Sequence, residues 1–169
     1  MGQQKAEKPD ASGEAFWRFS LALYARPGVA EALIALQDRA GCDVNLVLFG
    51  LWLGAARGHR LDRAELAAAE TAIAPLSHDI VGPLRRLRRG LRAQPAADLQ
   101  DLRRRLLALE LAAERRVQYR LAATASALPP SADRGAAAEA NLALCIGGES
   151  GSAEAAVLRQ ALAALTRRG

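Results

Sequence analysis

One uninterrupted apolar segment constrains the fold of this chain more than any other part of the sequence. Between Val44 and Ala56, only Asn45 is strongly polar. The run is about 13 residues long, whereas a helix that spans a bilayer needs roughly 20. A segment this apolar and this short is typical of a helix buried at the centre of a protein. We therefore expect a buried central helix at about 43–57, covered by the rest of the chain.

The composition of the chain favours helices throughout. Alanine and leucine dominate, aromatic residues make up only 4%, and β-branched residues are few, which is the balance of helix-forming sequences. No segment alternates polar and apolar residues as a strand does. We predict an all-α, single-domain bundle of about six to eight helices at residues 14–169. A polar tail at 1–13 should be disordered.

Capping residues on either side of Cys42 mark the start of the central helix. Gly41 suits the end of a preceding helix at about 27–40, and Asp43 suits the N-cap of the next one. Helices joined by so short a link are expected to fold back on each other. We therefore predict an αα-hairpin of the second and central helices.

Two prolines should interrupt the helix that follows. Asp62 and Glu65 have the spacing of a capping box, so a helix should start there. Pro75 and Pro83 each lack a backbone donor and disfavour helix in the preceding residue. We expect a kink or break near Pro75. The remaining helices are predicted at about 14–25, 76–92, 98–127, 135–146 and 153–166, the last three capped by Asp98, by Asp133 and by Ser150 or Ser152.

Aromatic and polar side chains near the central helix form a candidate ligand site. Asn45 continues into Phe49 and Trp52 along one helical face, and a buried Asn needs hydrogen-bond partners. Two interpretations remain open: the aromatic rings form plain core while Asn45 bonds to Gln37 or to a helix terminus, or Asn45 faces a pocket for an apolar or aromatic ligand. The candidate ligand-binding residues are Trp17, Tyr24, Gln37, Asn45 and Trp52.

Positive charge is concentrated between Gly82 and Arg120. Eleven arginines face four acidic residues there, a net charge of +7, while the whole chain carries +5. Arg85, Arg88, Arg89 and Arg92 share one face of an arginine-rich helix. That face could grip nucleic-acid phosphates or an acidic protein, or it could be a solvated surface with internal ion pairs.

The long helix at about 98–127 carries two further patterns. Leu99, Leu102, Leu106, Leu109 and Ala113 recur at coiled-coil-like spacing, which suits a protein partner or a homodimer. Glu110 and Glu114 stand one turn apart, where like charges repel. We expect both to be solvated and neutralised by arginines of neighbouring helices, the alternative being a site for a metal or a shared proton.

No set of side chains predicts a catalytic site, a metal site or a cofactor. His59 and His78 are isolated, and Cys42 and Cys145 form no C-x-x-C pair, which is typical of reduced thiols in the cytoplasm. The glycine-rich stretch at 147–151 lacks the Lys and Ser or Thr of a phosphate-binding loop. Residues 1–14 hold no apolar signal segment.

Several segments together resemble a bacterial family of short helical proteins of unknown function. They are Phe16–Leu21, Leu36–Asp38, Asp43–Leu46 continuing to Trp52, Val81–Arg85 and Glu110–Arg115, within roughly residues 14–120. The resemblance implies a helical bacterial domain and assigns no catalytic residue.

The sequence favours a non-enzymatic cytoplasmic protein-interaction or regulatory module over an enzyme. The absence of a catalytic set and the long amphipathic helix support this hypothesis. A small-ligand binder or enzyme using a pocket near Trp17, Asn45 and Trp52 is one alternative. Nucleic-acid binding through Arg85–Arg92 is the other.

Overall fold

A computed structural model describes residues 11–125, 128 and 133–167, and every regular element in this part of the chain is helical. Because α3 runs into η1, and α4 runs through η2 into α5, these residues form seven continuous helices. The prediction of an all-α bundle is therefore confirmed. The elements are α1 (Ala11–Tyr24), α2 (Val29–Ala40), α3 (Val44–Trp52), η1 (Leu53–Arg57), α4 (Arg63–Leu76), η2 (Ser77–Val81), α5 (Gly82–Gly90), α6 (Ala97–Thr124), α7 (Arg134–Ile146), η3 (Gly147–Gly151) and α8 (Ala153–Thr166).

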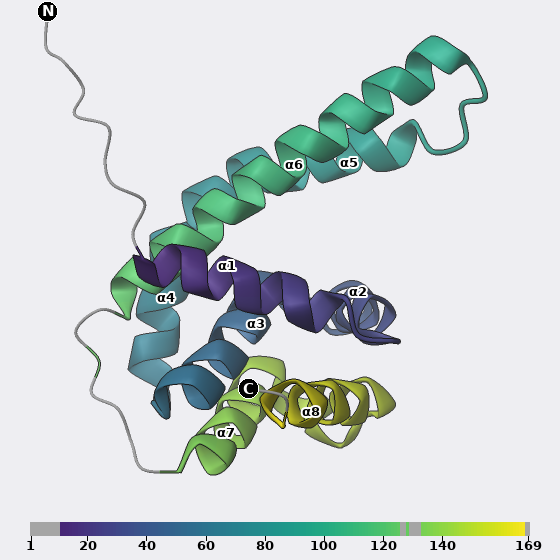
Figure 1. The fold of residues 1–169 in the computed structure, drawn as a ribbon. Helices are drawn as coiled ribbons and strands as arrows, with labels where there is room; N and C mark the ends of the chain where they lie inside the picture. Colours follow the sequence, from purple (N-terminus) through teal and green to yellow (C-terminus); the bar gives the residue numbers. More distant parts are fainter. Residues whose placement is uncertain (1–10, 126–127, 129–132, 168–169) are drawn as a thin grey trace, which may run out of the picture.

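The predicted central helix lies at the centre of the molecule. Residues 44–54 are all buried. The Asp43 side chain caps the start of α3 by accepting hydrogen bonds from the backbone N–H groups of Asn45 and Leu46. At the other end, Gly58 takes a left-handed conformation with φ of 66° after the π-helical turn η1, which a glycine adopts without steric penalty. Helices α1 and α6 cover one side of this central element and α7 covers the other (Figure 1).

Three aromatic rings fill the core between α1 and α3. The centroid of Phe16 lies 5.0 Å from that of Trp52 and 5.8 Å from that of Phe49. Trp52 is only 4% exposed. These distances are those of favourable aromatic pairs. Of the two interpretations of the aromatic residues, Phe16, Phe49 and Trp52 follow the one in which they pack as core.

The predicted hairpin of the second and central helices is wrong. Gly41 does end α2, in a left-handed conformation with φ of 68°. However, α2 is seen end-on in Figure 1 while α3 lies across it, so the two helices do not run back along each other. Instead α2 packs on α8, and Arg39 of α2 forms ion pairs with Glu149 and Glu154 at 2.9 and 3.0 Å.

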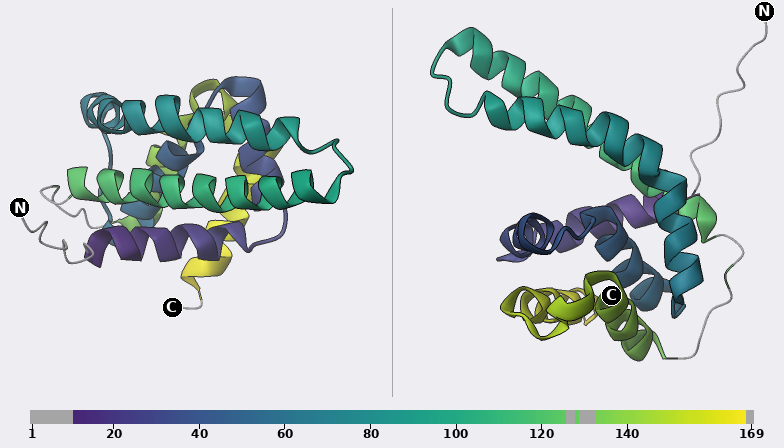
Figure 2. Two further views of the ribbon diagram at one scale, coloured as in Figure 1. Left: turned by 90° about the horizontal axis from the view of Figure 1, so that it is seen from above. Right: turned by 180° about the vertical axis from the view of Figure 1, so that it is seen from behind.

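The helix after Asp62 bends near Pro75, where a kink or break was predicted. The capping box of Asp62 and Glu65 is present as expected. Pro75 lies inside α4, and the chain continues through the π-helical turn η2 into α5. Pro83 is the second residue of α5, directly after η2, and it cannot donate a backbone hydrogen bond to the preceding turn. A π turn is a usual cause of a helix bend, and the bend between α4 and α5 is visible in Figure 2.

Several helix ends differ from the predictions. Helix α1 begins at Ala11, so the tail predicted at 1–13 is helical in its last residues, and 1–10 lie outside the described residues. Helix α2 begins at Val29, with Gly28 as its N-cap, and not near residue 27 as predicted. Ala96 precedes α6, whose N-cap makes no side-chain hydrogen bond, so the cap predicted at Asp98 is wrong. Its predicted end near 127 also lies outside the described residues.

Other caps match their predictions. Asp133 caps α7 and Ser152, not Ser150, caps α8. As to membranes, no described helix taken alone is both long and apolar enough to cross one. Only α1 and α2 taken together, which meet at 101°, reach the necessary length and composition.

Candidate functional site

A two-helix arm projects from the body of the molecule. It consists of α5, the following loop and the first half of α6, and we define the arm as residues 82–109. Figure 1 shows it extending to the upper right, and the view from behind in Figure 2 shows the same projection. No residue of the arm is buried. Two helices side by side cannot enclose a side chain, so the arm has no core of its own.

The arm is nevertheless rich in leucine. Eight of its residues are leucines, and four of them are large exposed apolar side chains: Leu87 is 60% exposed, Leu109 57%, Leu102 45% and Leu107 42%. We call Leu99, Leu102, Leu106, Leu109 and Ala113 the leucine stripe, as the sequence pattern suggested. Its members Leu99, Leu106 and Ala113 are half-buried. The stripe therefore presents an apolar surface that no described residue covers completely.

Four charged side chains join α5 to α6 at the root of the arm. Arg85 bonds to Glu110 at 3.1 Å and to Glu114 at 2.6 Å. Arg88 reaches both carboxylate oxygens of Glu110, at 2.5 and 3.1 Å. Such two-pronged arginine–carboxylate pairs are among the stronger polar contacts in proteins. The predicted neutralisation of both glutamates by a neighbouring helix is confirmed, but Glu110 is 4% exposed and is not solvated as expected.

Burial and charge act in opposite directions on these two glutamates. Burial alone would raise the pKa of Glu110, but hydrogen bonds from Arg88 and Arg85 outweigh it and hold that pKa below its ordinary value. At Glu114 burial dominates, and its pKa is raised despite the nearby Arg85. Glu110 is thus the charged anchor of the cluster, since its ionised form is the one that both arginines stabilise.

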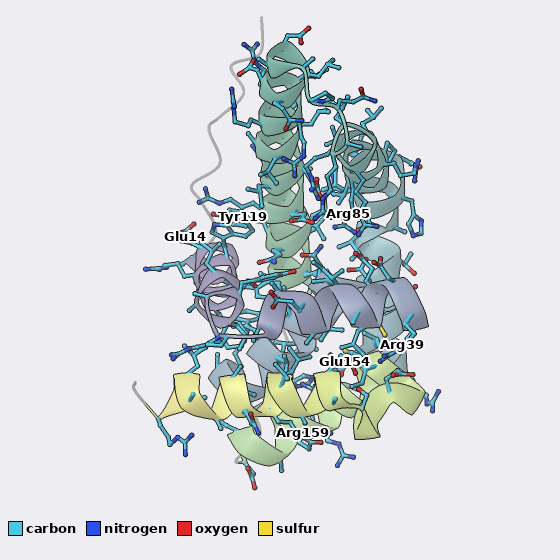
Figure 3. All side chains as sticks on the ribbon, turned by 90° about the vertical axis from the view of Figure 1, so that its right-hand side faces the viewer. Glu14, Arg39, Arg85, Tyr119, Glu154 and Arg159 are labelled. Carbon is cyan, nitrogen blue, oxygen red and sulfur yellow. The ribbon has the colours of Figure 1, made fainter. Side chains whose placement is uncertain are left out.

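The four arginines predicted to share a basic face have different surroundings. Arg85 and Arg88 turn toward α6 and are engaged by the glutamates; Figure 3 labels Arg85 beside α6. Arg89 lies 3.5 Å from Asp38 of α2, and Arg92 is exposed. Of the four, Arg92 is therefore fully on the surface, and Arg89 is half-exposed beside Asp38.

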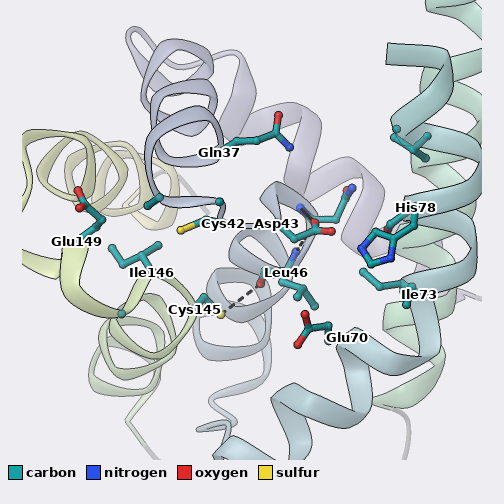
Figure 4. Close-up of a pocket in the computed structure, with 18 of the residues that line it drawn as sticks. Gln37, Cys42, Asp43, Leu46, Glu70, Ile73, His78, Cys145, Ile146 and Glu149 are labelled. Atoms are coloured by element: carbon teal, nitrogen blue, oxygen red, sulfur yellow. Dashed lines mark hydrogen bonds between the residues drawn. The ribbon is translucent and has the colours of Figure 1, made fainter. Parts of the chain in front are cut away.

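A polar cleft of about 830 Å³ opens between the end of α2, the start of α3, the α4–α5 helix and the end of α7. One wall of the cleft is formed by a single face of the continuous helix α4–η2–α5. Figure 4 shows His78 on this wall and Asp43 on the opposite one. The polar side chains that line the cleft include Gln37, Asp43, Asn45, Glu70 and His78.

The structure separates the five predicted ligand-binding residues. Gln37 and Asn45 line the cleft, whereas Trp52 stacks on Phe16 in the core. Trp17 is half-buried and lies 5.9 Å from the Arg115 guanidinium of α6. Tyr24 is 37% exposed. The aromatic and the polar members therefore do not share one pocket.

The buried Asn45 bonds to a residue that the sequence did not indicate. Its Oδ1 accepts a hydrogen bond of 3.1 Å from the Gln118 side chain of α6. Both side chains are buried, and the Gln118 Oε1 has no hydrogen-bond partner among the described residues. The predicted alternative partner, Gln37, makes no such bond. Asn45 thus links the floor of the cleft to α6.

Asn141 of α7 is a structural polar residue that sequence reasoning did not single out. It is fully buried and makes three hydrogen bonds to backbone. Its Oδ1 accepts from the Leu61 N–H at 2.8 Å, and its Nδ2 donates to the carbonyls of Gly50 at 2.9 Å and His59 at 2.8 Å. The sequence feature that could have identified Asn141 is a single Asn within an apolar run, as at Asn45.

Both cysteines and His78 line the cleft, whereas His59 does not. Cys42 and Cys145 are both free thiols beside the cleft, and burial raises the pKa of Cys145 to about 12. His59 bonds to Glu65 at 3.0 Å. Within the described ranges, no group of three or more His, Cys, Asp or Glu side chains could hold a metal ion.

Comparison with known proteins identifies a family and nothing further. A family model described as a protein of unknown function, DUF2390, matches residues 15–121. The match covers α1 to α6, including the arm, and agrees with the resemblance noted over roughly residues 14–120. No curated protein and no solved structure matches the chain.

Proposed function

We propose a function from the geometry of the chain. The chain belongs to the DUF2390 family, and the function of that family is unknown, so the family itself assigns none. The protein is a non-enzymatic protein-interaction module, and the arm is its binding surface. The partner packs against the leucine stripe and completes a core that two helices cannot form alone.

One observation carries this proposal: the arm holds eight leucines and no buried residue. Each Å² of apolar surface removed from water contributes roughly 25 cal/mol. Contiguous exposed apolar surface rimmed by charged groups is typical of interaction sites. The body of the same chain also has exposed apolar side chains, among them Leu21 and Ile34, but it buries a core that includes Phe16, Leu33 and Leu53. The arm has no buried residue, so the lack of a core belongs to the arm.

A photo-crosslinking residue placed in the full chain at Leu109 tests the proposal in cells of the source organism. We expect a discrete protein adduct from position 109 that becomes weaker when Leu102→Ser is added. Leu102 is 45% exposed, so this change should leave the thermal melting of the chain nearly unaffected. The matched control is a crosslinker at Ala156, an exposed position of α8. The proposal fails if both positions give the same adducts, or if position 109 gives none.

A further inference from the structure

We infer that the partner of the arm is an acidic amphipathic helix of another protein, which lies along the leucine stripe as a third helix. This inference rests on the proposed function and adds the chemistry of the partner. It follows from the charges that surround the stripe and from what those charges exclude.

The arm carries a high positive charge for its size. Residues 82–109 contain eight arginines and two aspartates, which gives 8 − 2 = +6. Arg86, Arg92 and Arg103 form no ion pair with any described residue. A surface with this charge attracts acidic partners and repels basic ones.

Cations border the apolar part of α6. Arg105 and Arg116 stand at i−4 and i+7 from Leu109, in the row next to the leucine stripe. The Arg105 side chain is 77% exposed although it bonds to Asp101, and Arg116 is exposed without an ion pair to the described residues. An amphipathic helix with leucine or isoleucine along its centre and Glu or Asp along its edge matches this arrangement in both apolar and charged parts.

A second copy of this chain matches the surface poorly. If two stripes packed antiparallel about a two-fold axis, Leu102 of one copy would lie against Leu109 of the other, and this pair would occur twice. The midpoint of that pairing falls beside Arg105, which would approach its own copy. Two arms of +6 would also repel along their length. Such a dimer would bury the leucines, but it would bring the arginines near one another without acidic partners.

Nucleic acid also leaves part of the surface unexplained. Phosphates would attract the arginines. However, residues 82–109 contain no aromatic side chain on which bases could stack. The exposed Leu102 and Leu109 would stay in water. A protein segment that is both acidic and apolar is the partner that uses both features.

Two synthetic helical peptides of about 20 residues test the inference against the full chain. Both carry the same leucine face; one has glutamate and the other lysine along the edges. By fluorescence anisotropy at low salt, we expect the glutamate peptide to bind about tenfold more tightly or better. Added salt should narrow this difference.

Variants of the chain assign any binding to the surface described. Arg105→Glu with Arg116→Glu should weaken binding of the glutamate peptide about tenfold. Arg105→Gln with Arg116→Gln should weaken it less, and this pair serves if the glutamate variants fold poorly. Arg63→Glu is the matched control, because Arg63 is exposed on α4 and lies outside the arm. This variant should bind the glutamate peptide as tightly as the unaltered chain does.

The outcomes separate this inference from the proposed function. Equal or tighter binding of the lysine peptide overturns the inference, and so does failure of both peptides to bind. An adduct from position 109 to a second copy, to nucleic acid or to a basic or uncharged protein segment also overturns it. Whenever the adduct is a protein, the proposed function still stands even if the inference is overturned. If position 109 gives no adduct, the proposed function and the inference both fail.

Discussion

Single polar side chains determine how the buried helices of this protein meet. Asn141 is the fullest case, because one amide satisfies the N–H of Leu61 and the carbonyls of Gly50 and His59. A buried backbone group without a partner is costly. The side chain thus fixes the exit of the central helix against α7.

Replacement of this amide should destabilise the fold strongly. Asn141→Ala removes three buried hydrogen bonds to backbone groups, and we expect the free energy of unfolding to fall by about 3 kcal/mol. Urea denaturation of the two proteins measures the difference. Gln160→Ala, at an exposed site on α8, should change stability by less than about 0.5 kcal/mol. A loss of similar size for both variants would contradict this role of Asn141.

The sequence indicated which polar residues matter only in part. Asn45 stood out because it interrupts an apolar run, and it is indeed buried. Its partner Gln118 lies 73 positions away, and no local pattern connects the two. The same limit applies to Trp17, because helical spacing alone does not tell which side of α1 faces the core.

At the scale of helices, the closest packing occurs where the central element crosses α7. A Cβ atom at Gly54 would lie 2.2 Å from the Cα of Ala138, and one at Gly50 would lie 2.9 Å from the Cys145 sulfur. These two glycines, one turn apart, let the backbones of η1 and α7 approach to contact. Gly54 meets backbone, which cannot move aside as a flexible side chain can.

Gly54→Ala should therefore push the two helices apart. We expect a loss of about 2–3 kcal/mol in the free energy of unfolding, which is typical of overpacking in a core. Gly90→Ala is a matched control, because Gly90 ends α5 with nothing within 4 Å of its Cβ position. That change should stabilise the chain by about 0.5 kcal/mol, since alanine favours helix over glycine. Thermal melting measures both; a harmless Gly54→Ala would rule out close contact at this crossing.

Helix ends could be predicted from sequence more reliably than helix neighbours. The caps at Asp43, Asp62 and Gly58 involve residues within a few positions of each other, so local spacing predicts them. The hairpin of α2 with α3 was predicted wrongly because the direction of α2 depends on α8, more than 100 positions later. The kink predicted near Pro75 depends on local sequence and is present as a bend, although proline spacing does not encode the π turn η2 that follows.

At the scale of the whole molecule, the chain divides into a body with a core and an arm without one. The sequence predicted the helices of the arm and the spacing of its leucines. It could not predict that the arm projects, because leucines at helical spacing look the same whether a neighbouring helix covers them or not. The charges gave the better signal, since arginines at this density are rarely buried.

The arm should open far more readily than the body. Local stability follows buried apolar contact, and the arm has no buried residue, while residues 44–54 are all buried. Native-state hydrogen exchange should therefore show amides at 84–90 and 99–109 exchanging through openings of much lower free energy than those of α3 and α7. The pairs of Arg85 and Arg88 with Glu110 should limit this opening at the root, so protection should rise toward Glu110. Saturating glutamate peptide should slow exchange in the arm and leave α7 unchanged. Equal protection of arm and body in the free chain would mean that the arm is covered without a partner, and would remove the physical basis for assigning it to binding.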